Sequence, residues 1–105
     1  MTTRELTLGE AMQEGIAEEM RRNADVLTMG ISIVAGTFPH TRGLAAEFGE
    51  RRVIDTPLSE PGMAGAAFGA AQEGLRPIVD FMYAGFSYFA ASEIFIQASQ
   101  YHFLH

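Results

Sequence analysis

The 105-residue sequence contains no cysteine, which excludes disulfides, a thiolate nucleophile and cysteine-ligated metal within it. It also contains no lysine: the seven basic residues are all arginines, they form no cluster, and thirteen acidic residues give a formal charge of -6. This charge balance argues against nucleic-acid binding. The N-terminus lacks the basic and then apolar layout of a signal peptide, so a cytoplasmic protein is the default expectation.

A long uninterrupted apolar run is also missing. Residues 81–105 are rich in aromatics and carry one formal charge, Glu93, but serine, glutamine and histidine interrupt them. A membrane-spanning helix needs about 20 mainly apolar residues, and an acid near its middle is costly in lipid. We therefore expect residues 81–105 to form a buried helix and the chain to have no membrane association.

What is present is a pattern for one α/β domain. Hydrophobic residues make up 48% of the chain and charged residues 19%, proportions typical of a globular protein, and the length allows one core. Helix and strand patterns alternate along it. The expected elements are a helix at 7–22, a strand at 26–30, a loop at 31–40, a short helix at 41–49, a strand at 53–56, a helix at 59–74 and a strand at 76–81. This alternation predicts a parallel sheet with crossover helices.

Hydroxyl side chains are placed to begin two of these helices. Thr7 and Glu10 fit a capping box, and Thr41 is expected to cap the short helix. In the first helix, Glu18 is placed to pair with Arg22. One apolar residue recurs every fourth position there and predicts a buried stripe: Leu8, Met12, Ile16 and Met20.

Glycine is concentrated in the uncharged helix that follows the second strand. Gly62, Gly65 and Gly69 lie at helical spacing, although each glycine costs a helix about 1 kcal/mol relative to alanine. The pattern fits a place where backbones approach closely. Gly49 and Gly74 are placed to end the two later helices.

Two acids mark the end of the second predicted strand. Asp55 ends it and Glu60 opens the next helix, where ligands of α/β proteins collect. Taken alone, the residues favour structural roles, because Glu60 complements the helix dipole and Asp55 suits a cap or turn. An aromatic group from Phe81 to Phe89 follows the third strand. Such groups are mostly core or interface, although a flat heteroaromatic ring could stack there with Glu60 as its polar contact.

Common catalytic motifs are missing from the chain. The three histidines form no zinc signature and are expected to be solvated or packed. There is no Gly-x-Gly-x-x-Gly loop, no Gly-Lys-Ser/Thr phosphate loop and no Gly-x-Ser-x-Gly elbow. No metal-binding residue is therefore expected.

Six segments occur in the order and spacing of one known family: Thr41-Arg42-Gly43-Leu44, Arg52-Val53-Ile54-Asp55-Thr56-Pro57-Leu58-Ser59-Glu60, Gly62-Met63-Ala64-Gly65, Gly69-Ala70-Ala71, Gly74-Leu75-Arg76-Pro77 and Asp80-Phe81-Met82. On these residues the chain resembles the β subunit of the thiamine-diphosphate-dependent dehydrogenase component of 2-oxoacid dehydrogenase complexes. That family includes pyruvate, branched-chain 2-oxoacid and acetoin dehydrogenases. The likeness covers nearly the whole chain.

The resemblance implies an incomplete transketolase-like pyrimidine-binding fold. Residues 1–105 would be the N-terminal part of the pyrimidine-binding domain, and the C-terminal transketolase-type domain would be absent. Glu60 matches the family's catalytic glutamate, which hydrogen-bonds a pyrimidine nitrogen and favours the imino tautomer. Phe86 matches the aromatic residue packed on the aminopyrimidine, and Leu58 and Met82 match neighbouring contacts. The glycine-rich helix would pack closely across the subunit interface.

The resemblance also implies shared chemistry. Thiamine diphosphate would be bound jointly with an α subunit, which would hold magnesium through a Gly-Asp-Gly…Asn element that this chain lacks. The expected reaction is oxidative decarboxylation of a 2-oxoacid with acyl transfer to lipoamide on an acyltransferase core, in an α2β2 assembly. Alone, the chain is expected to bind the cofactor poorly and to be inactive.

One departure and two alternatives accompany this hypothesis. Where the family commonly has Gly-Glu-Asp, this chain has Gly30-Ile31-Ser32, which removes an acid that could relay protons between paired sites. The first alternative is a truncated, non-catalytic interaction module or a remnant of such a subunit. The second is a single-chain relative of transketolase or deoxyxylulose-phosphate synthase type, which matches the motifs less well. These residues do not specify which 2-oxoacid is used.

Overall fold

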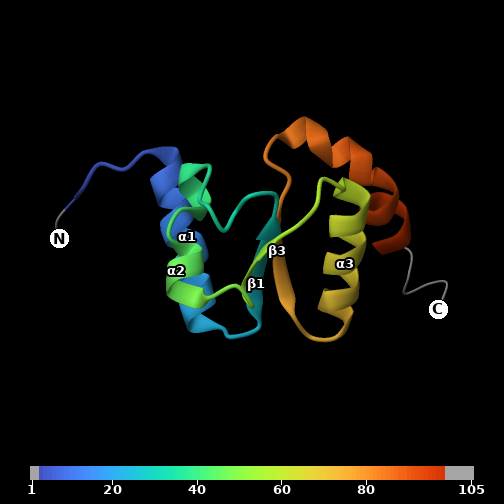
Figure 1. The fold of residues 1–105 in the computed structure, drawn as a ribbon, viewed down its shortest axis with the longest axis horizontal. Coiled ribbons are helices and arrows are strands. Elements are labelled where there is room, and N and C mark those ends of the chain that lie inside the picture. The colour runs from blue at the N-terminus through green and yellow to red at the C-terminus, as the bar shows by residue number, and fades with distance from the viewer. Residues whose placement is uncertain (1–2, 99–105) are drawn as a thin grey trace.

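Three short strands form one parallel sheet in the computed structural model, which describes residues 3–98 (Figure 1). They are β1 (Val26–Gly30), β2 (Val53–Asp55) and β3 (Arg76–Asp80), in the order β2-β1-β3. Gly30 pairs with Asp55 on one side and with Asp80 on the other, so the carboxyl ends of all three strands meet at one edge. The predicted α/β class with a parallel sheet is confirmed.

Helices cover both faces of this sheet (Figure 1). On one face lie α1 (Leu8–Arg22) and the short α2 (Leu44–Phe48), which follows a 3-10 turn, η1 (Pro39–Thr41). On the other face lie α3 (Glu60–Gln72) and the helical segments η2 (Ala84–Ala90) and η3 (Ser92–Ala98). The main core cluster lies between the α1–α2 layer and the sheet and consists of Ala17, Met20, Val26, Ile33, Leu44 and Val53.

Hydroxyl groups cap the starts of α1 and α3, and the cap predicted at Thr7 is confirmed. The Thr7 hydroxyl accepts the Glu10 N–H at 3.1 Å, and the Ser59 hydroxyl accepts the Gly62 N–H at 3.3 Å. Each bond satisfies an amide that has no partner inside its helix. Gly49, with φ of 82°, ends α2 as expected.

The cap predicted for Thr41 is wrong. Thr41 is buried in η1, where its hydroxyl donates to the Phe38 carbonyl. Gly43 begins α2 instead, with φ of 83°, a left-handed conformation that glycine adopts without strain. Because this residue turns the chain between Thr41 and α2, the threonine hydroxyl does not face the helix.

The predicted buried stripe of α1 is confirmed only in its second half. Met20 is fully buried and Ile16 is partly buried, whereas Leu8 is 79% and Met12 is 47% exposed. The helix has fifteen residues, about 22 Å, and β1 and β3 have five each, about 17 Å. The helix is therefore longer than the strands it packs on, and its first turns have little sheet beneath them.

Ion pairs on α1 also differ from expectation. Arg22 pairs with Glu19, three residues away, and not with Glu18. Both spacings bring side chains together on a helix, and the structure has the shorter one. Arg21 pairs with Glu47 and so joins α1 to α2.

Arg52 joins the end of α1 to β1. Its guanidinium donates to the carbonyls of Met20 at 2.5 Å, Asn23 at 3.0 Å and Val26 at 2.9 Å, and it lies 5.0 Å from the centre of the Phe48 ring. The forked guanidinium suits this task because it presents several donors in a fixed geometry. Carbonyls at a helix end, which lack partners in the helix itself, are satisfied in this way.

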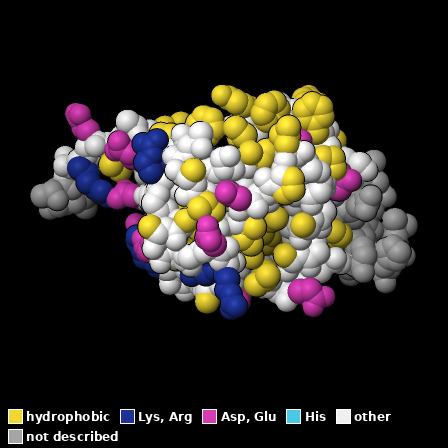
Figure 2. Space-filling model, viewed as in Figure 1, with side chains coloured by type: hydrophobic (Ala, Val, Ile, Leu, Met, Phe, Trp, Pro, Cys, Tyr) yellow, Lys and Arg dark blue, Asp and Glu magenta, His cyan; other side chains and the backbone are white. Residues whose placement is uncertain are grey.

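The prediction of one buried helix over 81–105 is wrong for the described part. The chain leaves β3 through a tight turn and then forms η2 and η3, which pack against α3 on one side only. The outer side of this segment stays exposed, and Figure 2 shows hydrophobic side chains gathered over it. The large exposed aromatics are Tyr83, Tyr88, Phe89 and Phe95. Residues 99–105 of the predicted helix lie outside the described residues.

Within residues 3–98, none of the helices is long and apolar enough to cross a bilayer.

Gly65 and Gly69 of α3 have free space around them in this chain. A Cβ added to Gly69 would meet nothing within 4 Å, and one added to Gly65 would make only an ordinary contact with Glu93. Close backbone approach at these glycines stays a prediction about a subunit interface.

Candidate functional site

Two aspartates hold loops at the carboxyl edge of the sheet. Asp55, at the end of β2, accepts the Val34 N–H through Oδ1 at 2.9 Å. Asp80, at the end of β3, accepts the Met82 N–H through Oδ1 at 2.8 Å. The Asp55 carboxylate thus has a structural contact, but with the loop that follows β1 and not with a cap or turn of its own as predicted.

Glu60 is a largely buried acidic residue at the start of α3. It is the first residue of the helix, and the whole residue is 8% exposed. No hydrogen-bond or ion-pair partner is found for its carboxylate within the described part of the chain. Glu60 therefore keeps its acceptor oxygens available to a ligand.

Glu60 lies in a pocket with aromatic and aliphatic walls. The pocket has a volume of about 380 Å³ and is lined by Leu58, Glu60, Phe86 and Phe89. The Phe86 ring centre lies 6.3 Å from that of Phe89 and 5.4 Å from that of Tyr83, which meets it edge-on. Three of the four site residues predicted from the resemblance, Leu58, Glu60 and Phe86, are thus brought together.

Met82, the fourth predicted site residue, lies beside this pocket and does not line it. It lines a neighbouring pocket of about 240 Å³ together with His40, Asp80 and Tyr83. Its own φ is 70°, a left-handed value that is rare for a residue with a large side chain. Its contact with the cofactor stays a prediction.

The pocket around Glu60 suits a flat heteroaromatic ring. Aromatic and aliphatic walls bury the faces of such a ring, and one well-placed polar group fixes its orientation. A carboxylate accepts a hydrogen bond from a protonated ring nitrogen or takes part in proton transfer. The arrangement therefore combines ring binding with a group that can hold a proton.

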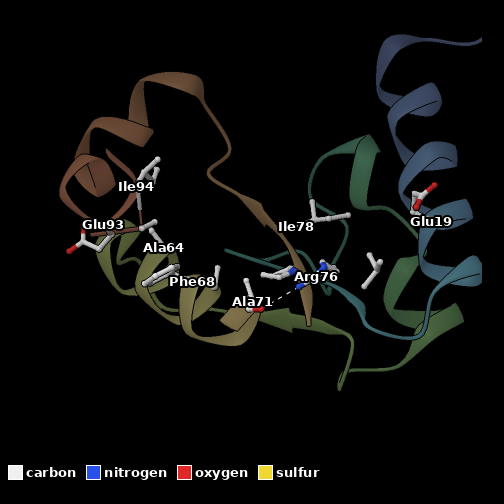
Figure 3. A pocket seen from close by; sticks show the side chains of 12 residues that line it. Glu19, Ala64, Phe68, Ala71, Arg76, Ile78, Glu93 and Ile94 are labelled. Atoms are coloured by element: carbon white, nitrogen blue, oxygen red, sulfur yellow. Dashed lines mark hydrogen bonds between the residues drawn. The ribbon is translucent and has the colours of Figure 1, made fainter. Parts of the chain in front are cut away.

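A larger pocket, of about 570 Å³, lies between α3, β3 and η3 (Figure 3). Its walls are mainly apolar, with Phe68, Ile78 and Ile94 among them. The Arg76 guanidinium at its rim donates to the backbone carbonyls of Ala71 and Leu75. Since its polar groups are engaged by the backbone or lie at the rim, it is a weaker candidate for chemistry than the pocket at Glu60.

His40 is packed near the site, and its hydrogen bond with Asp80 could not be predicted from the local sequence. Its Nε2 atom lies 2.9 Å from Asp80 Oδ2, and the two side chains are only 19% and 12% exposed. The pair is separated by 40 residues, so no spacing rule predicts it. The one available signal is that Asp80, like Asp55, ends a predicted strand. Residues 3–98 hold no group of three or more histidines, aspartates and glutamates that could bind a metal.

Comparison with known proteins agrees with this fold. Residues 4–103 match the family described as "Transketolase, pyrimidine binding domain", and the chain belongs to this family. It is 46% identical over 97 residues to the pyruvate dehydrogenase E1 component subunit beta of Rhizobium meliloti, covering 90% of this chain and 21% of that protein. The resemblance stated from the motifs is confirmed.

Relatives from eukaryotes are similar to a comparable degree. The mitochondrial pyruvate dehydrogenase E1 component subunit beta of Saccharomyces cerevisiae is 40% identical over 105 residues, covering 98% of this chain and 29% of that protein. The chloroplastic subunit beta-2 of Arabidopsis thaliana is 44% identical over 95 residues, covering 89% and 23%. The chain thus spans less than a third of the length of these relatives. The cytoplasmic location stays a prediction.

Proposed function

We propose that this chain supplies the aminopyrimidine side of a thiamine diphosphate site in a dehydrogenase that oxidatively decarboxylates a 2-oxoacid and passes the acyl group to lipoamide. The observation that carries this proposal is the carboxylate of Glu60, which has no partner within the described residues and lies in one pocket with Phe86 and Leu58. Family membership and the pyruvate dehydrogenase relatives support it.

The residues of the pocket fit the aminopyrimidine ring. Leu58, Phe86 and Phe89 supply apolar surface for its faces, and Glu60 supplies an acceptor for its edge. The pocket has no basic group for a diphosphate among its lining residues. We therefore assign the diphosphate and its magnesium ion to an α-subunit partner.

Glu60 would act by holding a proton at a ring nitrogen. Its carboxylate accepts the hydrogen bond of the protonated nitrogen and so favours the imino form of the aminopyrimidine. Leu58, which is 77% exposed, and Phe86 would lie against the ring, so the bound ring and the partner subunit would have to shield this bond from water. When bound, thiamine diphosphate supplies the electron sink that loss of carbon dioxide from a 2-oxoacid requires.

The same proposal defines partners. An α subunit would complete the site, an α2β2 assembly would bring two such sites together, and a lipoyl-bearing acyltransferase core would receive the acyl group. The names of the relatives, which are β subunits of a dehydrogenase component, support this arrangement. The chain alone would hold the ring side only, so its affinity for the cofactor would be low.

The test replaces Glu60 in the assembly of this chain with its α partner. Glu60→Gln keeps the shape of the side chain and removes its charge, and we expect decarboxylation to fall by about 10²-fold or more. Glu73→Gln is the matched control, since Glu73 is an exposed residue at the other end of α3. Activity of Glu60→Gln equal to that of the control would refute the role of Glu60.

Calorimetry separates the shared site from the alternatives. Thiamine diphosphate with magnesium should bind the assembly tightly and the isolated chain weakly. Micromolar binding by the isolated chain would contradict a shared site. Failure of the chain to form any cofactor-binding assembly with an α subunit would favour the non-catalytic interaction module.

A further inference from the structure

The chain makes a strained turn between β3 and the wall of the Glu60 pocket. Met82 has φ of 70°, and the Tyr83 N–H donates to the Phe81 carbonyl at 2.8 Å across it. A three-residue turn with this φ at its centre is a rare and strained γ-turn. Strain of this kind persists only where the surrounding structure holds it.

Asp80 holds this turn with both carboxylate oxygens. Oδ1 accepts the Met82 N–H at 2.8 Å, and Oδ2 is hydrogen-bonded to His40 Nε2 at 2.9 Å. The backbone of Asp80 is fixed as well, because it pairs with Gly30 so closely that a Cβ on Gly30 would lie 2.9 Å from its Cβ and carbonyl oxygen. The turn is thus tied to the central strand and to the loop before α2.

A series of aromatic contacts connects the turn at Met82 to the Glu60 pocket. Phe38 stacks on His40, with ring centres 6.1 Å apart, and meets Tyr83 edge-on at 6.2 Å. Tyr83 in turn meets Phe86 edge-on at 5.4 Å, and the Phe86 N–H donates to the Tyr83 carbonyl at 2.9 Å. Phe86 lines the pocket with Glu60.

We propose that Asp80, anchored by His40, is a positioning residue that sets Phe86 against Glu60 by holding the Met82 turn. The proposal rests on the proposed function, because it assigns Asp80 and His40 to the support of the same site. Neither side chain lines the Glu60 pocket, so both act through the turn and its aromatic contacts.

The experiment measures the dissociation constant of thiamine diphosphate with magnesium by calorimetry on the assembled enzyme. Asp80→Ala removes both hydrogen bonds, and we expect the dissociation constant to rise about tenfold or more. Asp80→Asn keeps an oxygen for the Met82 N–H and should stay within about threefold of the unsubstituted enzyme. His40→Phe keeps a ring against Phe38 and loses the hydrogen bond, so it should weaken binding.

Coupling between the two side chains gives a second readout. Because both act on one turn, the double variant Asp80→Ala with His40→Phe should bind about as weakly as Asp80→Ala alone. Independent effects that multiply in the double variant would contradict the proposed anchor.

The matched control is Asn23→Ala. Asn23 accepts the N–H of Asp25, two residues on, in the same kind of turn, but at the opposite edge of the sheet. It should lower the melting temperature of the cofactor-free assembly and leave the dissociation constant within about twofold. Equal weakening by Asn23→Ala and Asp80→Ala would mean general destabilisation and overturn the positioning role.

The two proposals fail in different ways. If the unsubstituted assembly binds the cofactor and Asp80→Ala binds it equally well, the positioning role is wrong and the proposed function stands. If the unsubstituted assembly does not bind the cofactor, both proposals fall. If Asp80→Ala does not assemble, Asp80→Asn and His40→Phe decide the matter through the same dissociation constants.

Discussion

The close packing of Gly30 against Asp80 makes a quantitative prediction about stability. A Cβ on Gly30 would lie 2.9 Å from the Asp80 Cβ and carbonyl oxygen and 3.1 Å from Ile33 Cγ2. Two of these three atoms belong to the backbone or its first carbon, so they cannot swing away as the end of a long side chain would. Overpacking of this kind costs about 1–3 kcal/mol.

The assay is equilibrium unfolding of Gly30→Ala in urea, followed by far-UV circular dichroism. With a urea dependence of about 1–1.5 kcal/mol per molar for a small domain, the midpoint should fall by about 0.7–3 M. Gly15→Ala is the matched control. Gly15 lies inside α1 with nothing within 4 Å of an added Cβ, so the same change there should stabilise the chain by about 1 kcal/mol.

The prediction is tested by whether each substitution raises or lowers the urea midpoint. If Gly30→Ala unfolds at the urea concentration of the unsubstituted chain or above it, while Gly15→Ala is stabilised, the contact between β1 and Asp80 is not rigid. The close pairing that fixes the backbone of Asp80 would then be refuted as well.

Two further predictions concern the α1–α2 layer. Arg52→Met keeps much of the apolar stem but removes the guanidinium donor from the carbonyls of Met20, Asn23 and Val26. The Asn23 carbonyl still accepts the Val26 N–H, and the loss of the other bonds should lower the free energy of unfolding by about 1.5–3 kcal/mol in urea titrations. The hydrogen bond from Arg21 holds the pKa of Glu47 below its ordinary value, and the stabilisation it gives is present above about pH 4.3 and lost as the pH falls through the lowered pKa. Glu47→Gln should therefore be less stable than the unsubstituted chain at neutral pH and equally stable in strong acid, and a difference that grows on acidification would contradict the pairing.

The elements that the sequence predicts well are those whose signals are local. The strand ends are correct to within one residue because Val53 and Ile54, or Ile78 and Val79, are flanked by residues that stop a strand. The cap predicted at Thr7 depends on a bond to the amide three residues away, and it is formed.

Errors occur where the deciding contact is distant. Periodicity places Leu8 and Met12 on one face with Met20 but cannot tell that the sheet is shorter than α1. The segment after β3 is rich in aromatics, and no local signal shows that its outer side would stay exposed beside α3 or that Met82 would turn the chain.

Some residues of the candidate site could be identified from the sequence, and others only from the fold. Glu60, Leu58 and Phe86 are identified because a resemblance matches motifs position by position, and the structure brings these three together. Composition and spacing alone favour a dipole role for Glu60. The His40–Asp80 bond joins residues far apart in sequence, so only the fold reveals it.

The lining of the Glu60 pocket has a consequence for how a ligand would enter. Thiamine diphosphate carries a cationic ring at its centre and an anionic tail, whereas the pocket offers a carboxylate and hydrocarbon on a chain of net charge -6. The tail would be repelled and the ring end drawn inward before any contact forms. The cofactor would thus approach in one orientation, with its ring end toward this chain and its anionic tail toward a more basic surface.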